Sequence, residues 1–596
     1  MESLLNFVQN YASLGGEIAV RQRRGYRMES WTYGQIGKRA NRLARELEVR
    51  GITKGDAVLL WGENSAEWIA AFLGCLLRGV AVVPIDHASS AEFARRVSQE
   101  VNAKLILCAG AHKECGTVPS IPVESLFTIT AKHDSSPYPS PPLSRQDTLE
   151  IIFTSGTTAE PRGVVISHGN VLANIEPLQA EIRKYLRYEK FVHPLRFLNL
   201  LPLSHVFGQM LGVFIPSLLA GTVVFIDSLR PAEFVDTIRR ERVSVVVAVP
   251  RFIESLQREV ERLPERDGKI ELFRKDFVLA EKEHFLRRWW RFRKIHSRLG
   301  WKFWAFISGG AALPKQAETF WNRLGYAVIQ GYGMTETTSL ISLNHPFRST
   351  QGSIGKVFPG MEVRVDGNGE ILVRGENVAT AYRQNGQTLS VAESDGWFRT
   401  GDVAETDVTG NLYFKGRRKN VIVTPAGMNV YPEDLEKALR AQPGIRDCVV
   451  IGLERDGNAE PCAVLLLNDS NGNPAAAIEG ANQSLAEYQK IRHSFLWPET
   501  DFPRTPTQKP ILPRIREVVQ NAKRGATEHA PAADSVAGLI ARITGRPVQP
   551  GPPDANLETD LHLSSLDRVE LMSALEQRHQ VDLNEAQFQD VTTVEQ

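Results

Sequence analysis

The stretch "FTSGTTAEPRGVVISH", Phe153–His168, decides the fold of this chain. It follows the apolar run "LEIIF", which is typical of a buried strand, and it crowds hydroxyls and a glycine into a short turn before the cation Arg162. Backbone N–H groups and small hydroxyls in such a turn can surround a phosphate. An ordinary Ser/Gly surface loop has a similar composition, so the stretch alone leaves both interpretations open.

Length and composition limit the classes of protein that need to be considered. A chain of 596 residues is too long for one hydrophobic core, so several domains are expected. The net charge of +1 gives no reason to expect a nucleic-acid partner. The five cysteines are scattered without a C-x-x-C pair, which argues against a disulfide framework or a zinc site and fits the cytoplasm. No signal peptide is visible at the N-terminus. The uncharged stretch Met210–Ile226 is too short to span a bilayer, and its sequence predicts a buried helix that leads into a strand.

The order of apolar runs predicts an α/β protein of several parts. Residues 1–415 alternate short apolar runs with longer amphipathic segments, as in "DAVLLWG", "SAEWIAAFLGCLLRG" and "VAVVPI", which favours largely parallel sheets. Residues 416–522 indicate a smaller α+β unit, with strands in "NVIVTPA", "DCVVIGL" and "AVLLLN" and a helix in "YPEDLEKALRAQ". Residues 523–535 have the composition of a flexible linker. Residues 536–596 then form a short all-α unit.

Three further polar clusters follow the opening stretch in order. "GYGMTETT", Gly331–Thr338, places the carboxylate of Glu336 directly after Thr335. A Gly-Asp turn supplies Asp402, and Arg417 follows it. "PRTPTQKPILPR" carries a single lysine, Lys509, among prolines. In isolation each residue has an ordinary interpretation as a turn residue, a helix-terminal acid or a solvated cation.

Taken together, the four clusters resemble the adenylate-forming superfamily of acyl-CoA synthetases, peptide-synthetase adenylation domains and luciferases. The resemblance covers roughly residues 10–520. It implies a large multi-sheet N-terminal adenylation domain, a small mobile α+β C-terminal subdomain, and a reaction in which a carboxylate attacks the α-phosphorus of ATP. Because positioning and charge neutralisation supply most of the catalysis in phosphoryl chemistry, hydrogen-bond donors and a metal are what such a site needs.

The resemblance assigns a role to each motif residue. Lys509, Thr335, Glu336 and Arg162 are implied to be catalytic, with Glu336 as the ligand of Mg²⁺. The implied ATP-binding residues are Thr154, Ser155, Gly156, Thr157, Thr158, Tyr332, Gly333, Asp402 and Arg417. Three positions depart from the family pattern: Arg162 replaces a lysine, and Ala159 and Gln508 replace glycines.

Further residues are implied on the acid side of the site and in the second half-reaction. His205 of "LPLSHVFG", Gly309 and Gly310 are expected at the substrate pocket, although a lone histidine is more often a satisfied core residue. Lys419 is the expected hinge about which the small subdomain rotates, and a solvated loop charge is the alternative for it. Gly427 is expected in the loop that completes the thioester-forming site.

The C-terminal stretch "NLETDLHLSSLDRVELMSALEQRHQVDL" resembles an acyl or peptidyl carrier domain. Aligning "SSLDRVEL" with that family places a covalent 4′-phosphopantetheine on Ser565, which implies a phosphopantetheinyl transferase as a partner. The alternative is a simple helix with Ser564 as its N-cap. The chain stops at "FQDVTTVEQ", where a carrier would continue into its last helix, so we expect either a longer native chain or an incomplete carrier.

The segment Arg287–Pro314 bears on which acid is used. Its basic and aromatic sequence resembles the part of long-chain fatty acyl synthetases that leads into "SGGA" at the acyl pocket. Phe285, Trp289, Phe292 and Leu299 recur at roughly helical spacing and predict one amphipathic helix. Its apolar face could contact a membrane surface or pack in the core.

We therefore interpret the sequence as a cytoplasmic ligase that uses ATP and Mg²⁺ to activate a fatty acid and loads it onto its own carrier. A long-chain acyl-CoA synthetase that releases its product on coenzyme A is the alternative enzyme. A non-catalytic nucleotide-binding or acyl-carrier scaffold is the alternative of another class. A downstream acyltransferase or synthase would receive the acyl group, and contact with the inner membrane surface is a further expectation.

Overall fold

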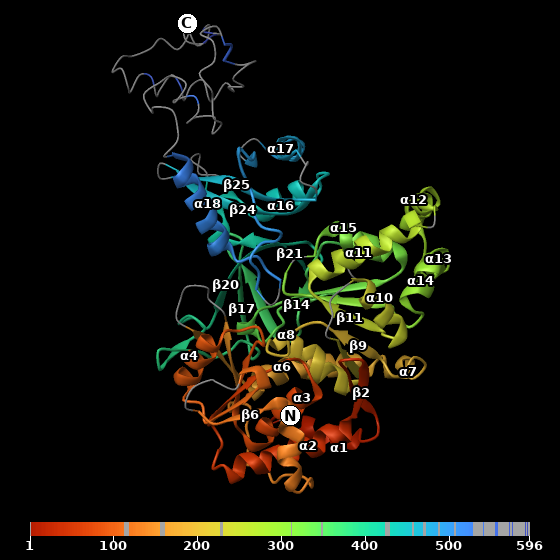
Figure 1. Cartoon of the computed structure of the whole chain (residues 1–596), viewed down its shortest axis with the longest axis vertical. Helices are drawn as coiled ribbons and strands as arrows, with labels where there is room; N and C mark the ends of the chain where they lie inside the picture. The colour runs from red at the N-terminus through yellow and green to blue at the C-terminus, as the bar shows by residue number, and fades with distance from the viewer. Residues whose placement is uncertain are drawn as a thin grey trace. The chain divides into compact units, whose positions relative to one another are not determined.

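The structure is a computed structural model of the whole chain (Figure 1). It describes residues 2–112, 118–154, 161–226, 231–266, 268–311, 313–346, 350–423, 429–455, 458–468, 473–486, 489–505, 508–527, 540, 555–557, 571, 575, 591 and 593. The chain divides into two compact units. The large unit contains residues 1–418 together with Arg504–Lys509, and the small unit contains residues 419–503 and 510–596.

The larger sheet of the large unit is parallel in its middle and antiparallel at one side. Within the described residues its 13 strands have the order β16-β17-β20-β21-β15-β14-β13-β12-β11-β9-β10-β1-β2. The parallel strands, in spatial order, are β13 (Ala327–Tyr332), β12 (Ala305–Ser308), β11 (Val245–Ala248), β9 (Arg196–Asn199), β10 (Thr222–Phe225) and β1 (Ile18–Arg24). The others are β2 (Arg27–Thr32), β14 (Ser342–Leu343), β15 (Gly355–Val357), β16 (Met361–Val365), β17 (Glu370–Gly375), β20 (Phe398–Thr406) and β21 (Asn411–Arg417).

Apolar residues on the two faces of these parallel strands point into different clusters. Leu198, Val224 and Val246 face helices α10 (Pro231–Arg240), α11 (Pro250–Arg266), α14 (Arg293–Leu299) and α15 (Lys315–Leu324), which lie beside these strands in Figure 1. Phe197 and Val245 belong to a second cluster on the opposite face. Strands buried on both faces are typical of parallel sheets covered by helices, so the predicted α/β class is confirmed.

The second sheet of the large unit carries the opening stretch of the sequence. Among the described residues its order is β19-β18-β8-β7-β4-β3-β5-β6. The bounds are β3 (Ala57–Trp61), β4 (Ala81–Ile85), β5 (Leu105–Cys108), β6 (Ser120–Pro122), β7 (Thr148–Thr154), β8 (Arg162–Ser167), β18 (Ala381–Gln384) and β19 (Gln387–Ser390). Strands β7, β4, β3, β5 and β6 run parallel, whereas β8, β18 and β19 are antiparallel additions.

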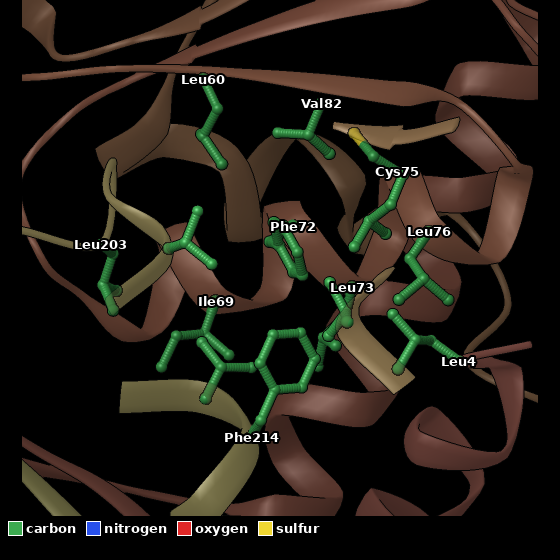
Figure 2. Packing of buried hydrophobic residues seen from close by; sticks show 14 of the residues in the cluster. Leu4, Leu60, Ile69, Phe72, Leu73, Cys75, Leu76, Val82, Leu203 and Phe214 are labelled. Carbon is green, nitrogen blue, oxygen red and sulfur yellow. The ribbon is translucent and has the colours of Figure 1, made fainter. Parts of the chain in front are cut away.

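Helix α3 (Ala66–Arg78) forms the centre of the largest hydrophobic cluster. Ser65 caps its N-terminus and Gly79, with φ of 71°, ends it in the left-handed conformation that glycine adopts readily. Figure 2 shows Phe72 of α3 near Phe214, and their ring centroids lie 6.1 Å apart. A side chain at Gly74 would come within 2.9 Å of Leu43, so glycine here allows close packing of α3 against α2 (Tyr33–Val49).

The small unit is α+β, as predicted. Strands β24 (Ile445–Arg455), β25 (Asn458–Leu467) and β26 (His493–Leu496) form one sheet, and β22 (Ile422–Val423) pairs with β23 (Asn429–Val430). Alternate residues of β24 enter two different cores: Val450 packs with α16 (Pro432–Arg440) and α17 (Pro474–Asn482), and Ile451 packs with α18 (Leu512–Thr527). Because α18 continues to Thr527, the first five residues of the predicted linker, 523–527, are helical.

The prediction of one amphipathic helix across Phe285–Leu299 is wrong. The chain forms α13 (Phe285–Arg291) and α14, with a break at Phe292, whose φ and ψ are −95° and 23°. Phe292 and Leu299 are buried, but Phe285 and Trp289 are 57% and 41% exposed. The break turns the two halves to different surroundings, so the regular spacing of the four apolar residues does not produce one shared face.

The prediction for Met210–Ile226 is confirmed. Helix α8 (Val206–Gln209), a π-helical turn at Met210–Phe214 and α9 (Ile215–Leu218) run without interruption and lead into β10. Every residue of the π-helical turn is buried. Within the described ranges, no helix combines the length and the apolar character that crossing a bilayer requires.

Candidate active site

Strands β7 and β8 position the opening stretch. They form an antiparallel pair in which Thr154 lies opposite Arg162 and Phe153 lies opposite Gly163. The predicted phosphate-binding residues Ser155, Gly156, Thr157 and Thr158, and the neighbouring Ala159, lie outside the described residues. The phosphate cradle therefore stays a prediction, but the two strands that carry it are in place at the edge of the parallel part of the sheet.

Arg162 and Glu336 approach the same tyrosine. The guanidinium carbon of Arg162 lies 3.3 Å from the ring centroid of Tyr382 on β18, a cation–π contact. The Tyr382 hydroxyl donates to Glu336 Oε1 at 3.1 Å. Burial and the neighbouring Glu336 carboxylate raise the pKa of Tyr382, so its hydroxyl keeps its proton at neutral pH. Two predicted catalytic residues, 174 positions apart in sequence, are thus brought together by a third residue.

The turn that carries Thr335 and Glu336 follows β13 and has a tightly determined backbone. A side chain at Gly333 would lie 2.0 Å from the Ser339 carbonyl oxygen, so only glycine fits there. Thr338 and Ser339 have φ of 50° and 86°, a conformation that costs non-glycine residues free energy and that clusters at functional sites.

Buried amides hold this turn in its unfavourable conformation. Asn174 of α6 (His168–Arg183) donates to the Thr338 carbonyl at 2.6 Å, and Asn377 donates to the Leu340 carbonyl at 2.8 Å. Asn377 also donates to Asn174 Oδ1 at 3.0 Å. Since all these groups are buried, the network fixes where Glu336 lies relative to β13.

Tyr332, Asp402 and Arg417 form a second cluster at the end of the same strand. Asp402 on β20 lies opposite Arg417 on β21 in the register of that hairpin. The Tyr332 hydroxyl donates to Asp402 Oδ2 at 2.9 Å, and Arg417 Nε lies 3.1 Å from Asp402 Oδ1. Burial raises the pKa of Asp402, while Arg417, Tyr332 and Lys509 oppose the increase. Tyr332, Asp402 and Arg417 are therefore adjacent, as the prediction of a shared ribose and adenine site requires.

Lys509 also belongs to the large unit. Thr505 holds its loop: the Lys509 N–H donates to Thr505 Oγ1 at 3.1 Å, and the Thr505 N–H donates to the Lys509 carbonyl at 2.8 Å. Desolvation and repulsion from Arg417 lower the pKa of Lys509 to about 8, and attraction from Asp402 opposes this. Lys509 is exposed to solvent, which screens part of this effect.

His205 is the N-cap residue of α8. Its Nε2 is buried and has no hydrogen-bond partner among the described residues. Burial lowers the pKa of His205, repulsion from Lys509 lowers it further, and Asp86 opposes the decrease. A neutral imidazole with an uncommitted buried nitrogen, within electrostatic range of Lys509, suits a binding site better than a satisfied core position.

Gly309 and Gly310 follow β12 directly. A side chain at Gly309 would come within 2.6 Å of the Phe207 ring, and Gly310 has φ of 81°. Both positions therefore require glycine, which explains the "SGG" sequence by backbone geometry. Phe207 lies on α8, two residues after His205, so the three predicted pocket residues lie in neighbouring segments.

Three predicted residues have a limited structural description. Lys419 lies in the turn Arg418–Asn420, and the division between the two units falls between Arg418 and Lys419. Gly427 and Ser565 lie outside the described residues.

Comparison with known proteins identifies the family. The profile of the family described as "AMP-binding enzyme" matches residues 9–383. This chain belongs to the AMP-binding enzyme family. Residues 534–596 match the profile described as "Phosphopantetheine attachment site", the region that contains Ser565.

Curated relatives of this AMP-binding enzyme include long-chain fatty-acid–CoA ligases. Ligase FadD15 of Mycobacterium tuberculosis is 30% identical over 465 residues, which cover 71% of this chain and 76% of the relative. Ligase FadD13 of the same species is 28% identical over 509 residues, 82% of this chain and 92% of the relative. Among solved structures, ATP-bound MatB from Rhodopseudomonas palustris has a TM-score of 0.70 at 22% identity, covering 88% of this chain and all of the other, which supports the fold.

Sequence reasoning missed Tyr382, although it lies within the region that matches the AMP-binding enzyme family. The surrounding "NVATAYRQNG" contains no charged pair or glycine-rich turn that would single out the tyrosine. Its role depends on the pairing of β18 with β8, which places Tyr382 opposite Val164, two residues from Arg162. Sequence spacing gives no indication of that pairing.

Proposed function

We propose that this AMP-binding enzyme activates a fatty acid with ATP and transfers the acyl group to its own carrier region. The observation that carries this proposal is the meeting of separate sequence segments in the large unit: Arg162 and Glu336 at Tyr382, and Asp402 with Arg417 near Lys509. The fatty-acid ligases among its relatives support a long-chain acid as substrate, and the C-terminal match supports the carrier as acceptor.

In the first half-reaction, a carboxylate oxygen of the fatty acid forms a bond to the α-phosphorus of ATP. The bond from that phosphorus to the bridging oxygen of the β-phosphate breaks, and pyrophosphate leaves. Arg162 offers donors to the β- and γ-phosphates, Thr335 contacts the α-phosphate, and the Lys509 ammonium neutralises charge on the acid and the α-phosphate oxygens. Asp402 accepts from the ribose hydroxyls, Arg417 donates to them, and Tyr332 lies against the adenine.

The Glu336 side chain fits a Mg²⁺ site. One carboxylate oxygen accepts from Tyr382, and Oε2 has no hydrogen-bond partner among the described residues. Mg²⁺ commonly uses one or two protein carboxylates and completes its shell with water and substrate phosphates. When bound, the ion would supply neutralisation of phosphate charge, and Glu336 would hold it.

In the second half-reaction, the thiolate of 4′-phosphopantetheine on Ser565 attacks the carbonyl carbon of the acyl adenylate. A C–S bond forms, the bond between that carbon and the phosphate oxygen breaks, AMP leaves, and the thiol proton passes to solvent. A phosphopantetheinyl transferase must first attach the arm, and an acyltransferase or synthase would remove the acyl group afterwards. Rotation about Lys419, the first residue of the small unit, would withdraw the segment Arg504–Lys509 from the large unit and bring in the loop of Gly427.

Pyrophosphate release in the presence of MgATP and a fatty acid tests the first half-reaction. We expect release that depends on the acid and disappears in Lys509→Ala. No release with any chain length, in a protein that still binds ATP, would favour the non-catalytic scaffold. Release of acyl-CoA when coenzyme A is added, with an unloaded Ser565, would favour the acyl-CoA synthetase instead.

Contact with the inner membrane surface is supported by an unusual set of exposed apolar side chains. The aromatic-basic surface consists of Phe285, Leu286 and Trp290, all more than half exposed, with Arg287, Arg293 and Lys294 exposed beside them in sequence. The guanidinium carbon of Arg293 lies 4.7 Å from the centroid of the Trp290 ring. Phe191 and Trp301 are also more than half exposed, and Lys302 Nζ, which donates to the Val192 carbonyl at 3.0 Å, joins their two segments. Tryptophan with basic neighbours suits the headgroup region of an anionic bilayer.

Sedimentation with vesicles tests this surface. We expect the protein to sediment with phosphatidylglycerol vesicles and not with phosphatidylcholine vesicles, and Phe285→Ala/Trp290→Ala to reduce the bound fraction. Tyr26→Ala is the matched control, because Tyr26 is a fully exposed aromatic residue at the turn between β1 and β2. Equal binding of the double variant and the control would contradict the assignment.

A further inference from the structure

Tyr382 lies between two charged side chains, Arg162 and Glu336, that have no other side-chain partner among the described residues. The Arg162 side chain has no ion pair or hydrogen bond within the described ranges, and its guanidinium carbon lies 3.3 Å from the centroid of the Tyr382 ring. Glu336 receives the Tyr382 hydroxyl on Oε1, while Oε2 is uncommitted among the same residues. One tyrosine therefore contacts a cation through its ring and a carboxylate through its hydroxyl.

The surrounding fold fixes Tyr382 itself. Its side chain is only 6% exposed, and its backbone is held on both sides, because β18 pairs with β8 and with β19. Ala379, three residues earlier, donates its N–H to the Glu336 carbonyl at 2.7 Å. The backbone and the side chain of Glu336 thus both accept hydrogen bonds from the segment that carries Tyr382.

The charges explain why such an arrangement is needed. Arg162 and Glu336 are oppositely charged and both lie beside Tyr382, yet they form no ion pair with each other. A direct ion pair would use the guanidinium donors and the carboxylate oxygens that phosphates and a cation would otherwise contact. The ring and hydroxyl of Tyr382 engage both groups without using the remaining donors or Oε2.

We propose that Tyr382 is a positioning residue that holds Arg162 and Glu336 apart and oriented, Arg162 toward the phosphates and Glu336 toward the divalent cation. This inference rests on the proposed adenylation function. It explains how an arginine can serve where the family usually has a lysine: the planar guanidinium stacks on the aromatic ring, which a lysine ammonium cannot do. Groups that orient a metal-binding side chain typically change metal affinity or activity by about 10–100-fold when they are removed.

Two substitutions at Tyr382 separate the two contacts. Tyr382→Phe removes the hydroxyl that orients Glu336 and keeps the ring under Arg162, and Tyr382→Leu removes both. Tyr326→Phe is the matched control, because Tyr326 is equally buried and its hydroxyl has no hydrogen-bond partner in the described part of the chain. Circular dichroism establishes that each variant folds.

The readout is calorimetric binding of ATP to the full chain at a series of Mg²⁺ concentrations, without fatty acid. For Tyr382→Phe we expect the Mg²⁺ concentration that gives half-maximal ATP affinity to rise about 10-fold or more, with affinity at saturating Mg²⁺ little changed. For Tyr382→Leu we expect affinity at saturating Mg²⁺ to fall as well, because Arg162 loses its support. In a protein that already carries Arg162→Lys, adding Tyr382→Leu should reduce the ATP affinity less than Tyr382→Leu does in the wild type.

Two results would overturn the proposal. One is a Mg²⁺ dependence in Tyr382→Phe that equals that of the wild type and of Tyr326→Phe. The other is equal ATP affinity of Tyr382→Phe and Tyr382→Leu at saturating Mg²⁺. A wild-type protein that binds MgATP but releases no pyrophosphate with fatty acids would instead refute the proposed function, since the binding measurement needs no acid.

Discussion

Glu150 lies on β7, just before the phosphate loop, and is a carboxyl group without exposed surface. Its Oε2 accepts from Gln209 Nε2 at 2.8 Å, and its Oε1 is buried with no hydrogen-bond partner among the described residues. Burial raises the pKa of Glu150 from 4.5 to about 8, and the Gln209 amide opposes the increase. In the native protein the group is therefore neutral at pH 7, whereas in the unfolded chain it is ionised.

Glu150→Gln should stabilise the protein at neutral pH. Between pH 4.5 and about 8 the native carboxyl holds a proton that the unfolded one has released, so this group's stabilisation is fully present below pH 4.5 and is lost as the pH rises toward 8. The loss is about 1.4 kcal/mol per pH unit, or roughly 3 kcal/mol at pH 7 and under about 1 kcal/mol at pH 5. Glutamine has nearly the same shape, accepts the Gln209 bond, and does not titrate.

Thermal unfolding at pH 5, 6, 7 and 8 measures this effect. For a unit of this size, 1 kcal/mol corresponds to about 1–2 °C in Tm, so the advantage of Glu150→Gln should grow by about 2–5 °C between pH 5 and pH 7. Glu271→Gln on α12 (Ile270–Leu279) is the control, because that side chain is 81% exposed. An advantage that is the same at every pH, or that falls as pH rises, would refute a buried neutral Glu150.

Three further predictions concern the adenylation site itself. The pKa of Lys509 is lowered to about 8, so its ammonium is charged below that pH. Pyrophosphate release that depends on the fatty acid should therefore fall as the pH rises through 8. A rate that stays constant up to pH 10 would contradict the role of the ammonium. Gln508 has φ of 63° and accepts from Arg251 Nη1 at 3.2 Å. Gln508→Gly and Gln508→Ala both lose this hydrogen bond, but only glycine relieves the backbone strain of about 1 kcal/mol, so the adenylation rate of Gln508→Gly should exceed that of Gln508→Ala several-fold; equal rates of the two variants would refute this. Gly333→Ala places a carbon 2.0 Å from the Ser339 carbonyl oxygen. This variant should abolish pyrophosphate release and lower the free energy of unfolding by about 1–3 kcal/mol. Gly16→Ala is the control and should have little effect, because a side chain at Gly16 meets nothing within 4 Å.

Local features of the fold could be predicted from the sequence, because strong periodicity and turn residues are local signals. The strands in "DAVLLWG" and "VAVVPI" and the helix between them were predicted close to their observed bounds. The order of strands in the sheets could not be predicted from the sequence, because β1 pairs with β10 across about 200 residues and β18 pairs with β8 across a similar interval. No local pattern encodes such pairing.

The candidate site likewise combines residues that sequence motifs predict with one residue, Tyr382, that they do not. Glu336, Asp402, Arg417 and Lys509 were predicted from motif resemblance, and the structure places them in two neighbouring clusters of one unit. Tyr382 was missed because its contribution arises from a long-range strand pair. The helix predicted at Phe285–Leu299 failed because a single bend at Phe292 changes which residues share a face.

The central claim is that the acyl adenylate is transferred to the chain's own carrier, and mass spectrometry of the Ser565 peptide tests it most directly. The full chain is co-expressed with a phosphopantetheinyl transferase and given MgATP and a mixture of fatty acids, with and without coenzyme A. We predict acylated phosphopantetheine on Ser565 without coenzyme A, absent from Ser565→Ala and from Lys509→Ala, with the mass of the acyl group identifying the chain length. A bare phosphopantetheine arm on Ser565, with acyl-CoA formed in solution, would contradict the claim.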